Sequence, residues 1–297
     1  MKYSRNQFLM WTDIDITIIS SINPLQDIYD GFGIFYSLEK EFSRFLEKSD
    51  LNLLNNLKEL EVSNRFIDVL DLTRQIYLDT EKYFNPLINL KNIWYSSDFK
   101  EWIFKKVEIK QNIDLEKISI IWNFVSLKEN QNLDLGWIVK WYWVDLVSNF
   151  FKEKGYTDFI INAWWDIYLS WENSPWNTPV VAIDNPFNPE DIFSTLEIKD
   201  MAISTSGIYK RKWNINWKDF HHILNPIKNC NNNDIISISL IADKCYIADS
   251  YATACIAMWI EKSLIFLKKH NIDWIIIWSD WNIYKTNGMS NYNLNII

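Results

Sequence analysis

Glycine is scarce in this chain, with 6 glycines against 17 tryptophans in 297 residues. Cysteine and histidine are scarce too, with three of each. Cys230, Cys245 and Cys255 have neither metal-ligand spacing nor an even pairing, which argues against a disulfide framework and fits a reducing compartment. The chain also lacks further Cys/His clusters, so a zinc site is not expected.

Long apolar runs and positive charge are also missing. No uncharged run reaches the roughly 18 residues of a membrane-spanning helix, so no transmembrane segment is expected. The first residues lack the apolar stretch of a signal peptide and a lipid-accepting cysteine, which favours a cytoplasmic location. The net charge is −8 and the pI is about 5.0, so we expect no nucleic-acid partner.

Many tryptophans stand where turns ordinarily hold glycine. Trp281 follows Asp280 between two apolar runs, where a hairpin favours Asp-Gly, and Trp164 follows an apolar run where a tight reversal favours glycine. A bulky aromatic residue cannot cheaply adopt a positive φ, whereas glycine can. We hypothesise that these are UGA codons that the source reads as glycine; the alternative is a protein rich in tryptophan stacking platforms. The fifteen positions concerned are 11, 94, 122, 137, 141, 143, 164, 165, 171, 176, 217, 259, 274, 278 and 281.

Periodicity predicts a mixture of helices and hairpins in one large domain, residues 1–297, or in two closely packed lobes. An α+β fold with mixed or antiparallel sheets flanked by helices is therefore favoured over a doubly wound sheet. Helices are expected over 25–47, 64–82, 138–153, 249–258 and 261–269. Strands are expected over 8–19, 102–109, 117–127, 159–163, 179–184 and 235–242, with a hairpin at the end of the chain.

Residues 134–145 (DLGWIVKWYWVD) form the first chemical motif. With glycine at 137, 141 and 143, a glycine pair would open a helix and let its backbone N–H groups approach a phosphate. Lys140 in the first turn would add positive charge. The spacing matches neither a P-loop nor a dinucleotide fingerprint. A glycine-capped helix with a surface lysine is the alternative.

Asp249 and Thr253 form the second motif because residues four apart share one face of a helix. A carboxylate and a hydroxyl are hard oxygen ligands suited to Mg²⁺. Alternatively, Asp249 caps the helix and Thr253 bonds back to the helix backbone. The third motif joins residues 204–207 (STSG) to the adjacent pair His221 and His222, which suits proton transfer, although a buried structural histidine is the alternative.

Taken together, these motifs resemble the FAD:protein FMN transferase family (the ApbE family). With glycine restored, the matching segments are MGT at 10–12, FSRF at 42–45, YFNP at 83–86, DLGGIVKG at 134–141, NAGGD at 162–166, STSG at 204–207, HHI at 221–223 and ADSYATA at 248–254. The resemblance implies an ApbE-like fold, related to the T-fold, with two interlocked lobes.

The resemblance also implies residue roles. FAD would be the substrate, with Mg²⁺ held by the backbone carbonyl of Trp137 (glycine intended), Asp249 and Thr253. Lys140 would neutralise charge that develops on the pyrophosphate, and His222 would be the general base. The flavin-nucleotide site would be lined by Met10, Phe45, Tyr83, Phe84, Asn85, Asp134, Lys140 and Ile223.

The implied reaction moves FMN onto a Ser or Thr of an acceptor flavoprotein through a phosphoester bond and releases AMP. This chain departs from the family pattern at Phe45, often Tyr, at Asn85, often Asp, and after residue 226, where a Thr-Gly pair is usual. A Mg²⁺-dependent FAD pyrophosphatase and a flavin-binding protein without turnover are the alternatives.

Overall fold

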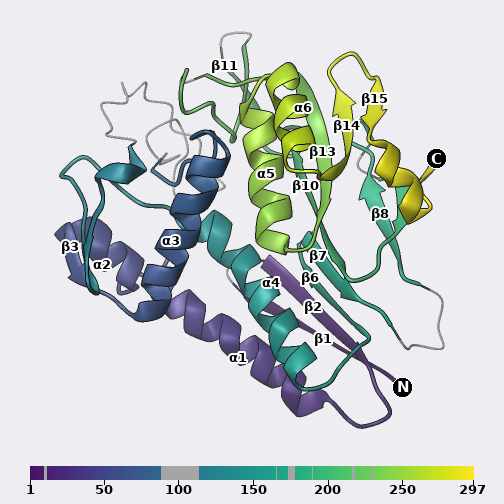
Figure 1. Ribbon diagram of the computed structural model, residues 1–297, viewed down its shortest axis with the longest axis horizontal. Helices are drawn as coiled ribbons and strands as arrows, with labels where there is room; N and C mark the ends of the chain where they lie inside the picture. The colour runs from purple at the N-terminus through teal and green to yellow at the C-terminus, as the bar shows by residue number, and fades with distance from the viewer. Residues whose placement is uncertain are drawn as a thin grey trace. The chain divides into compact units, whose positions relative to one another are not determined.

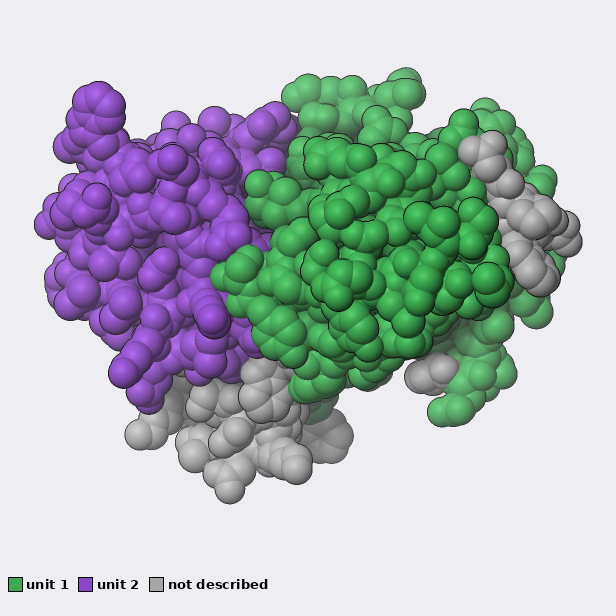
Figure 2. Space-filling model, turned by 90° about the horizontal axis from the view of Figure 1, so that it is seen from below, with its two compact units in different colours: residues 1–37, 140–297 green, residues 38–139 purple. Residues whose placement is uncertain are grey.

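A computed structural model describes residues 1–9, 12–87, 114–164, 166–172, 178–188, 190–215, 218–228 and 230–297. Met10 and the strand expected over 102–109 lie outside the described residues. So do Trp11, Trp94, Trp165, Trp176 and Trp217. The chain divides into two compact units: unit 1 holds residues 1–37 and 140–297, and unit 2 holds residues 38–139 (Figure 2). A single domain over residues 1–297 stays a prediction.

Unit 1 is built on an eight-stranded antiparallel sheet (Figure 1). In spatial order its strands are β1 (Lys2–Leu9), β2 (Thr12–Ile19), β6 (Phe159–Ala163), β7 (Asp166–Ser170), β10 (Met201–Gly207), β13 (Ile235–Ala242), β14 (Asp273–Trp278) and β15 (Ile283–Lys285). In β2, Ile14, Ile16 and Ile18 are fully buried, while Asp13 and Asp15 on the opposite face are exposed. This alternation follows from the two-residue period of a strand.

The interior strand β13 is buried along most of its length because it is covered on both faces. The helix α5 (Cys245–Ala257) packs on β10 and β13 (Figure 1). A hydrophobic cluster joins Ile241 of β13 to Val181 and Leu196 of a second antiparallel sheet. That sheet has the order β16 (Asn295–Ile296), β9 (Ile192–Glu197) and β8 (Val180–Asp184). Unit 1 also contains α6 (Ile260–Lys269), the 3₁₀ helix η3 (Asn287–Tyr292) and the hairpin of β11 (Lys212–Ile215) and β12 (Lys218–His221).

Unit 2 combines two helices, α2 and α3, with a small antiparallel sheet. Ser49 and Ser63 cap the helices, each accepting a backbone N–H three residues on, as N-cap serines do. Its elements are α2 (Asp50–Leu57), α3 (Asn64–Asp79), the 3₁₀ helix η2 (Leu115–Lys117) and the sheet of β3 (Glu59–Glu61), β5 (Phe124–Ser126) and β4 (Ser119–Ile121). The helices α1 (Leu25–Phe42) and α4 (Gly136–Glu153) carry residues of both units.

Several expected elements differ from the observed ones; the helix expected over 25–47, for example, ends at Phe42. The single strand over 8–19 is wrong in its start, because the chain forms a hairpin of β1 and β2 with Leu9 paired to Thr12. The strand over 117–127 is the hairpin of β4 and β5, which turns at Trp122 and Asn123. The helix expected over 249–258 begins at Cys245, because Asp145 of α4 caps it from outside the segment. Such long-range contacts leave no trace in local periodicity.

The α+β fold with antiparallel sheets flanked by helices is confirmed. Over the described ranges, the structure contains no helix long and apolar enough to cross a membrane.

Candidate functional site

Three titratable side chains from separate elements of unit 1 lie near enough to shift one another's pKa. Lys140 comes from α4, Asp166 begins β7, and Asp249 lies on α5. Asp166 is 4% exposed and Asp249 is 5% exposed. Burial lowers the pKa of Lys140 to about 8, and the negative charges of Asp166 and Asp249 oppose that shift. The cluster is therefore an electrostatically coupled group of one cation and two carboxyls.

Burial destabilises the ionised form of both carboxyls. Burial raises the pKa of Asp166 well above its usual range, and the neighbouring Asp249 adds to the shift. Burial raises the pKa of Asp249 to about 7, against the attraction of Lys140. Within the described ranges, Oδ1 of Asp166 and Oδ2 of Asp249 are buried without a hydrogen-bond partner. Such oxygens are costly unless a donor or a cation engages them.

The donor set of this cluster fits a hard cation. Asp249 and Thr253 lie one turn apart on α5, and the Thr253 hydroxyl shares a hydrogen bond of 3.2 Å with Ser206 of β10. Among the described residues, no three His, Cys, Asp or Glu side chains gather into a metal-binding group. A cation here would take its other ligands from hydroxyl, backbone, water or phosphate oxygens, as Mg²⁺ commonly does.

The alternative in which Asp249 caps its helix is wrong. The helix α5 begins at Cys245 and its N-cap residue is Lys244, whose side chain makes no capping bond. Asp145 of α4 takes that role instead: its two carboxylate oxygens accept the N–H groups of Cys245 and Tyr246, each at 3.0 Å. Asp145 thereby fixes the start of α5 against α4, one turn before Asp249.

Asp145 and Asp166 were not given roles from the sequence, although both stand inside quoted motifs. Burial raises the pKa of Asp145 to about 6, while the two backbone N–H donors lower it. For Asp166 the available signal was a carboxylate directly after a tight turn at the start of a strand. Neither the capping of α5 by Asp145 nor the nearness of Asp166 to Lys140 and Asp249 could be deduced without knowing which strands and helices are neighbours.

The two adjacent histidines have different environments. Nε2 of His221 lies 3.0 Å from the carbonyl oxygen of Asn232, and Nδ1 accepts the N–H of Ile223. His221 is therefore a buried structural histidine. Burial lowers the pKa of His222 to about 3, and Arg211 and His221 add to that shift. The imidazole of His222 is thus neutral near pH 7, which is the form that accepts a proton.

Two indoles surround the ammonium group of Lys140. Its Nζ lies 3.8 Å from the ring centroid of Trp141 and 5.2 Å from that of Trp164. The guanidinium of Arg211 lies 4.8 Å from the same Trp164 ring. In the chain as written, aromatic faces rather than anions therefore neighbour this lysine on that side.

In unit 2, contacts join three of the predicted segments. Asp134 pairs with Arg44 at 2.7 Å, accepts the N–H of Gly136 at 3.1 Å and donates its own N–H to the carbonyl of Pro86 at 2.8 Å. The Arg44 guanidinium lies 4.9 Å from the centroid of the Phe45 ring, which is 41% exposed. Segments 42–45, 83–86 and 134–136 therefore meet, and Arg44 is the residue that sequence reasoning missed.

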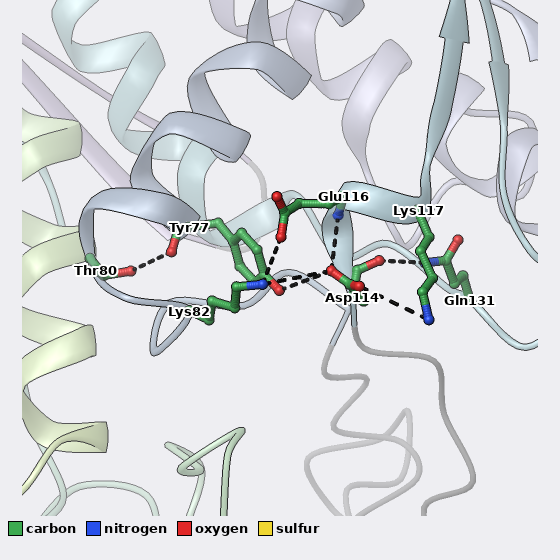
Figure 3. Close-up of polar contacts among 7 residues, drawn as sticks. All are labelled: Tyr77, Thr80, Lys82, Asp114, Glu116, Lys117 and Gln131. Carbon is green, nitrogen blue, oxygen red and sulfur yellow. Dashed lines mark hydrogen bonds and ion pairs between the residues drawn. The ribbon is translucent and has the colours of Figure 1, made fainter.

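The segment Tyr83–Asn85 is held by the end of α3. The Thr80 hydroxyl donates to the carbonyl of Ile76 and accepts the N–H of Phe84. Tyr83 and Phe84 are buried, and the side chain of Asn85 accepts the N–H of Leu87. Beside this segment, Lys82 bridges Glu116 at 2.6 Å and Asp114 at 4.0 Å (Figure 3). These contacts set where the chain lies at 83–85.

The other predicted site residues are placed as follows. Trp137 is the second residue of α4, on the same helix as Lys140. Ile223 is buried, and its carbonyl accepts a hydrogen bond from the Asn231 side chain. Met10 lies outside the described residues. The roles of these residues stay predictions.

Comparison with known proteins identifies several that are similar to this chain. The model of the ApbE family matches residues 10–276. An FAD:protein FMN transferase of Buchnera aphidicola is 23% identical over 264 residues, which cover 84% of this chain and 77% of that protein. The crystal structure of the ApbE protein from Thermotoga maritima superposes with a TM-score of 0.87 at 18% identity, covering 98% of this chain and 99% of that one. The flavin transferase ApbE from Vibrio cholerae gives a TM-score of 0.82 at 19% identity, with the same coverage.

Proposed function

Because the chain belongs to the ApbE family, we propose that it is an FAD:protein FMN transferase, the activity named for its relatives. A Ser or Thr hydroxyl oxygen of an acceptor flavoprotein forms a bond to the FMN phosphorus of FAD. The bond between that phosphorus and the bridging pyrophosphate oxygen breaks, AMP leaves with the electron pair, and the hydroxyl proton passes to a base. The match of the ApbE family model to residues 10–276 is the observation that carries this proposal, and the neighbouring groups Lys140, Asp166 and Asp249 support it.

The proposed cation is Mg²⁺, held by Asp249 and Thr253, with the carbonyl oxygen of residue 137 as the predicted third ligand. The unpartnered Oδ2 of Asp249 and the hard oxygen character of these groups support this assignment. When bound, Mg²⁺ would neutralise negative charge on the pyrophosphate.

The side chains of the protein supply the remaining chemistry. With a pKa of about 8, Lys140 is mostly protonated near pH 7 and can stabilise charge on the phosphate oxygens as the bond breaks. His222 is the proposed base, and its neutral form supports that role. Its low pKa means that the protonated form needs negative charge nearby, which the phosphates of FAD would provide.

For the flavin-nucleotide site we keep the predicted lining of Met10, Phe45, Tyr83, Phe84, Asn85, Asp134, Lys140 and Ile223. Two observations in unit 2 support it. The exposed Phe45 ring offers a stacking face, and the hydrogen bond between Asp134 and Pro86 joins two of the segments.

We also propose that the working protein carries glycine at many of the tryptophan positions, through UGA read as glycine. Trp122, Trp164 and Trp281 have φ values of 55°, 53° and 70°. Trp122 and Asn123 form the two-residue turn between β4 and β5, and Trp164 begins the turn between β6 and β7. Trp281 is the last residue of a turn, which its N–H closes by donating to the carbonyl of Trp278. These hairpin positions favour glycine because it takes positive φ without steric cost.

Crowding inside α4 supports the same proposal. The ring centroids of Trp143 and Phe35 are 3.2 Å apart, closer than the ~4.5–7 Å of ordinary aromatic pairs. In the described part of the chain, the indole N–H group of Trp143 is buried without a partner. Glycine at 141 and 164 would also remove both rings that neighbour the Lys140 ammonium group, and so open it to an anionic substrate.

The function is tested by incubating the glycine-restored protein with FAD, Mg²⁺ and a small acceptor flavoprotein domain that carries a target Thr. The expected result is AMP release together with flavin fluorescence on the acceptor in a denaturing gel. AMP with only free FMN would favour an FAD pyrophosphatase. FAD binding without AMP would favour a flavin-binding protein.

The glycine assignment has its own test, which needs no activity. Mass spectrometry of the protein made in its native host, on peptides that contain residues 122, 164 and 281, should show glycine at each position. Tryptophan in those peptides, or UGG at those codons, would refute the proposal.

A further inference from the structure

The hydroxyl of Thr253 is bonded differently from those of Thr73 and Ser250, which also lie inside helices. Thr73 and Ser250 donate to the carbonyl oxygens four residues earlier, those of Val69 and Tyr246, as serine and threonine inside helices commonly do. Thr253 instead shares its hydrogen bond with Ser206 of β10. The side chain of Thr253 is therefore directed by a strand outside its own helix.

Ser206 belongs to a row of hydroxyl residues on β10 that divides between the two faces of the strand. Ser204 and Ser206 share one face because side chains alternate along a strand. Ser204 donates to the buried carboxyl of Asp166, and Ser206 meets Thr253 at 3.2 Å. Thr205 points to the opposite face and shares a hydrogen bond of 2.7 Å with Ser239 of β13. The face toward α5 thus supports two oxygen groups of the candidate site.

We propose that Ser206 is a positioning residue for the cation site, which accepts the hydroxyl hydrogen of Thr253 and so turns the Thr253 lone pairs toward the face of α5 that carries Asp249. This inference rests on the proposed function, because it gives Thr253 the role of a cation ligand.

The physical reason lies in the single hydrogen of a threonine hydroxyl. A neutral hydroxyl that offers a lone pair to a divalent cation must direct its hydrogen elsewhere. If that hydrogen went to the carbonyl four residues back, the helix itself would set the direction of the lone pairs. Ser206, the acceptor on β10, instead selects a different rotation of the Thr253 side chain. Groups that orient metal ligands in this way typically change metal affinity by about 10–100-fold.

The test compares Ser206→Ala with the matched control Thr205→Val. Each variant removes one hydroxyl–hydroxyl hydrogen bond from β10, on opposite faces of the strand. Mg²⁺ binding is measured by calorimetric titration with MgCl₂ alone, and by the rise in unfolding temperature that MgCl₂ causes. Ser206→Ala should weaken Mg²⁺ binding by about tenfold. Thr205→Val should change it by less than about twofold, because its partner lies away from the site.

A double-mutant cycle separates positioning from general loosening of the fold. If Ser206 acts through Thr253, then Ser206→Ala combined with Thr253→Val should bind Mg²⁺ no more weakly than Thr253→Val alone. Additive losses, or equal binding by Ser206→Ala and the unmodified protein, would overturn the inference and leave the proposed function intact. No saturable Mg²⁺ binding by the unmodified protein would overturn both.

Discussion

Two lysines, one from each unit, respond in opposite ways to their surroundings. In unit 1 burial lowers the pKa of Lys140 despite two neighbouring carboxyls. In unit 2 the pKa of Lys82 is raised by its hydrogen bond to Glu116 (Figure 3), and the Lys82 side chain is 46% exposed. Opposite charges stand near both lysines, so desolvation makes the difference. Burial therefore destabilises the charge of Lys140, whereas water and Glu116 stabilise the charge of Lys82.

The largest effect should come from Asp249→Ala. It removes the buried carboxylate proposed to hold Mg²⁺, so AMP release should fall on the order of a thousandfold. FAD binding, followed by quenching of flavin fluorescence, should fall much less. Asp158→Ala is a control from the same unit, since that carboxylate accepts the N–H of Glu172 rather than facing the cluster. Unchanged turnover in Asp249→Ala would remove the carboxylate from the mechanism.

Replacing Lys140 should have the next largest effect. Lys140→Gln should lower kcat by about a hundredfold, because a positive charge near the breaking bond is lost. Activity of the unmodified enzyme should decline above pH 8, where Lys140 loses its proton. Lys140→Arg keeps the charge at all of these pH values, so its residual activity should not show that decline. A decline shared by both proteins would assign the titration to another group.

The pKa of Lys140 also predicts a dependence of stability on pH. Its folded pKa of about 8 lies below the ordinary value of 10.5. The unfolded chain therefore binds the proton more tightly, and the free energy of unfolding should rise with pH between these two values. In Lys140→Gln that rise should be smaller, as measured by urea unfolding at pH 8 and pH 10.

Asp145→Ala should destabilise the protein without touching the reacting groups. It leaves the N–H groups of Cys245 and Tyr246 buried without their acceptor, at a cost of about 2–4 kcal/mol in the free energy of unfolding. Because the folded pKa is raised to about 6 from 3.8, ionised Asp145 costs stability. Relative to Asp145→Asn, the unmodified protein should therefore lose stability as the pH rises through that range. Equal urea midpoints for all three proteins would contradict this role.

The smallest effect should come from Arg44→Gln in unit 2. The ion pair with Asp134 is partly exposed, with 29% and 11% of the two side chains accessible. Its loss should change the free energy of unfolding by at most about 1 kcal/mol, and less in high salt. A loss as large as that of Asp145→Ala would contradict the interpretation of this ion pair as a weak, partly exposed contact.

Elements with strong local patterns were predictable from the sequence. The strand Ile235–Ala242 and the helix that ends at Lys269 agree with their apolar patterns. The interpretation failed where pairing replaces periodicity: β1 carries few buried residues, so its alternation was invisible, and it is a strand because it pairs with β2. Likewise β9 to β12 were not expected, since strands gain their definition from the neighbours with which they pair.

By itself, the sequence determined the candidate chemistry: a lysine in the first turns of a helix, an Asp and a Thr one helical turn apart, and turns that call for glycine. These are properties of residues close together in the chain, where helix and turn geometry relate them directly. Only the tertiary structure decided that Asp166 joins Lys140 and Asp249, that Asp145 caps α5, and that Ser206 meets Thr253. Those contacts come from the order of strands in the sheet and from the packing of α5 upon it, which no local pattern encodes.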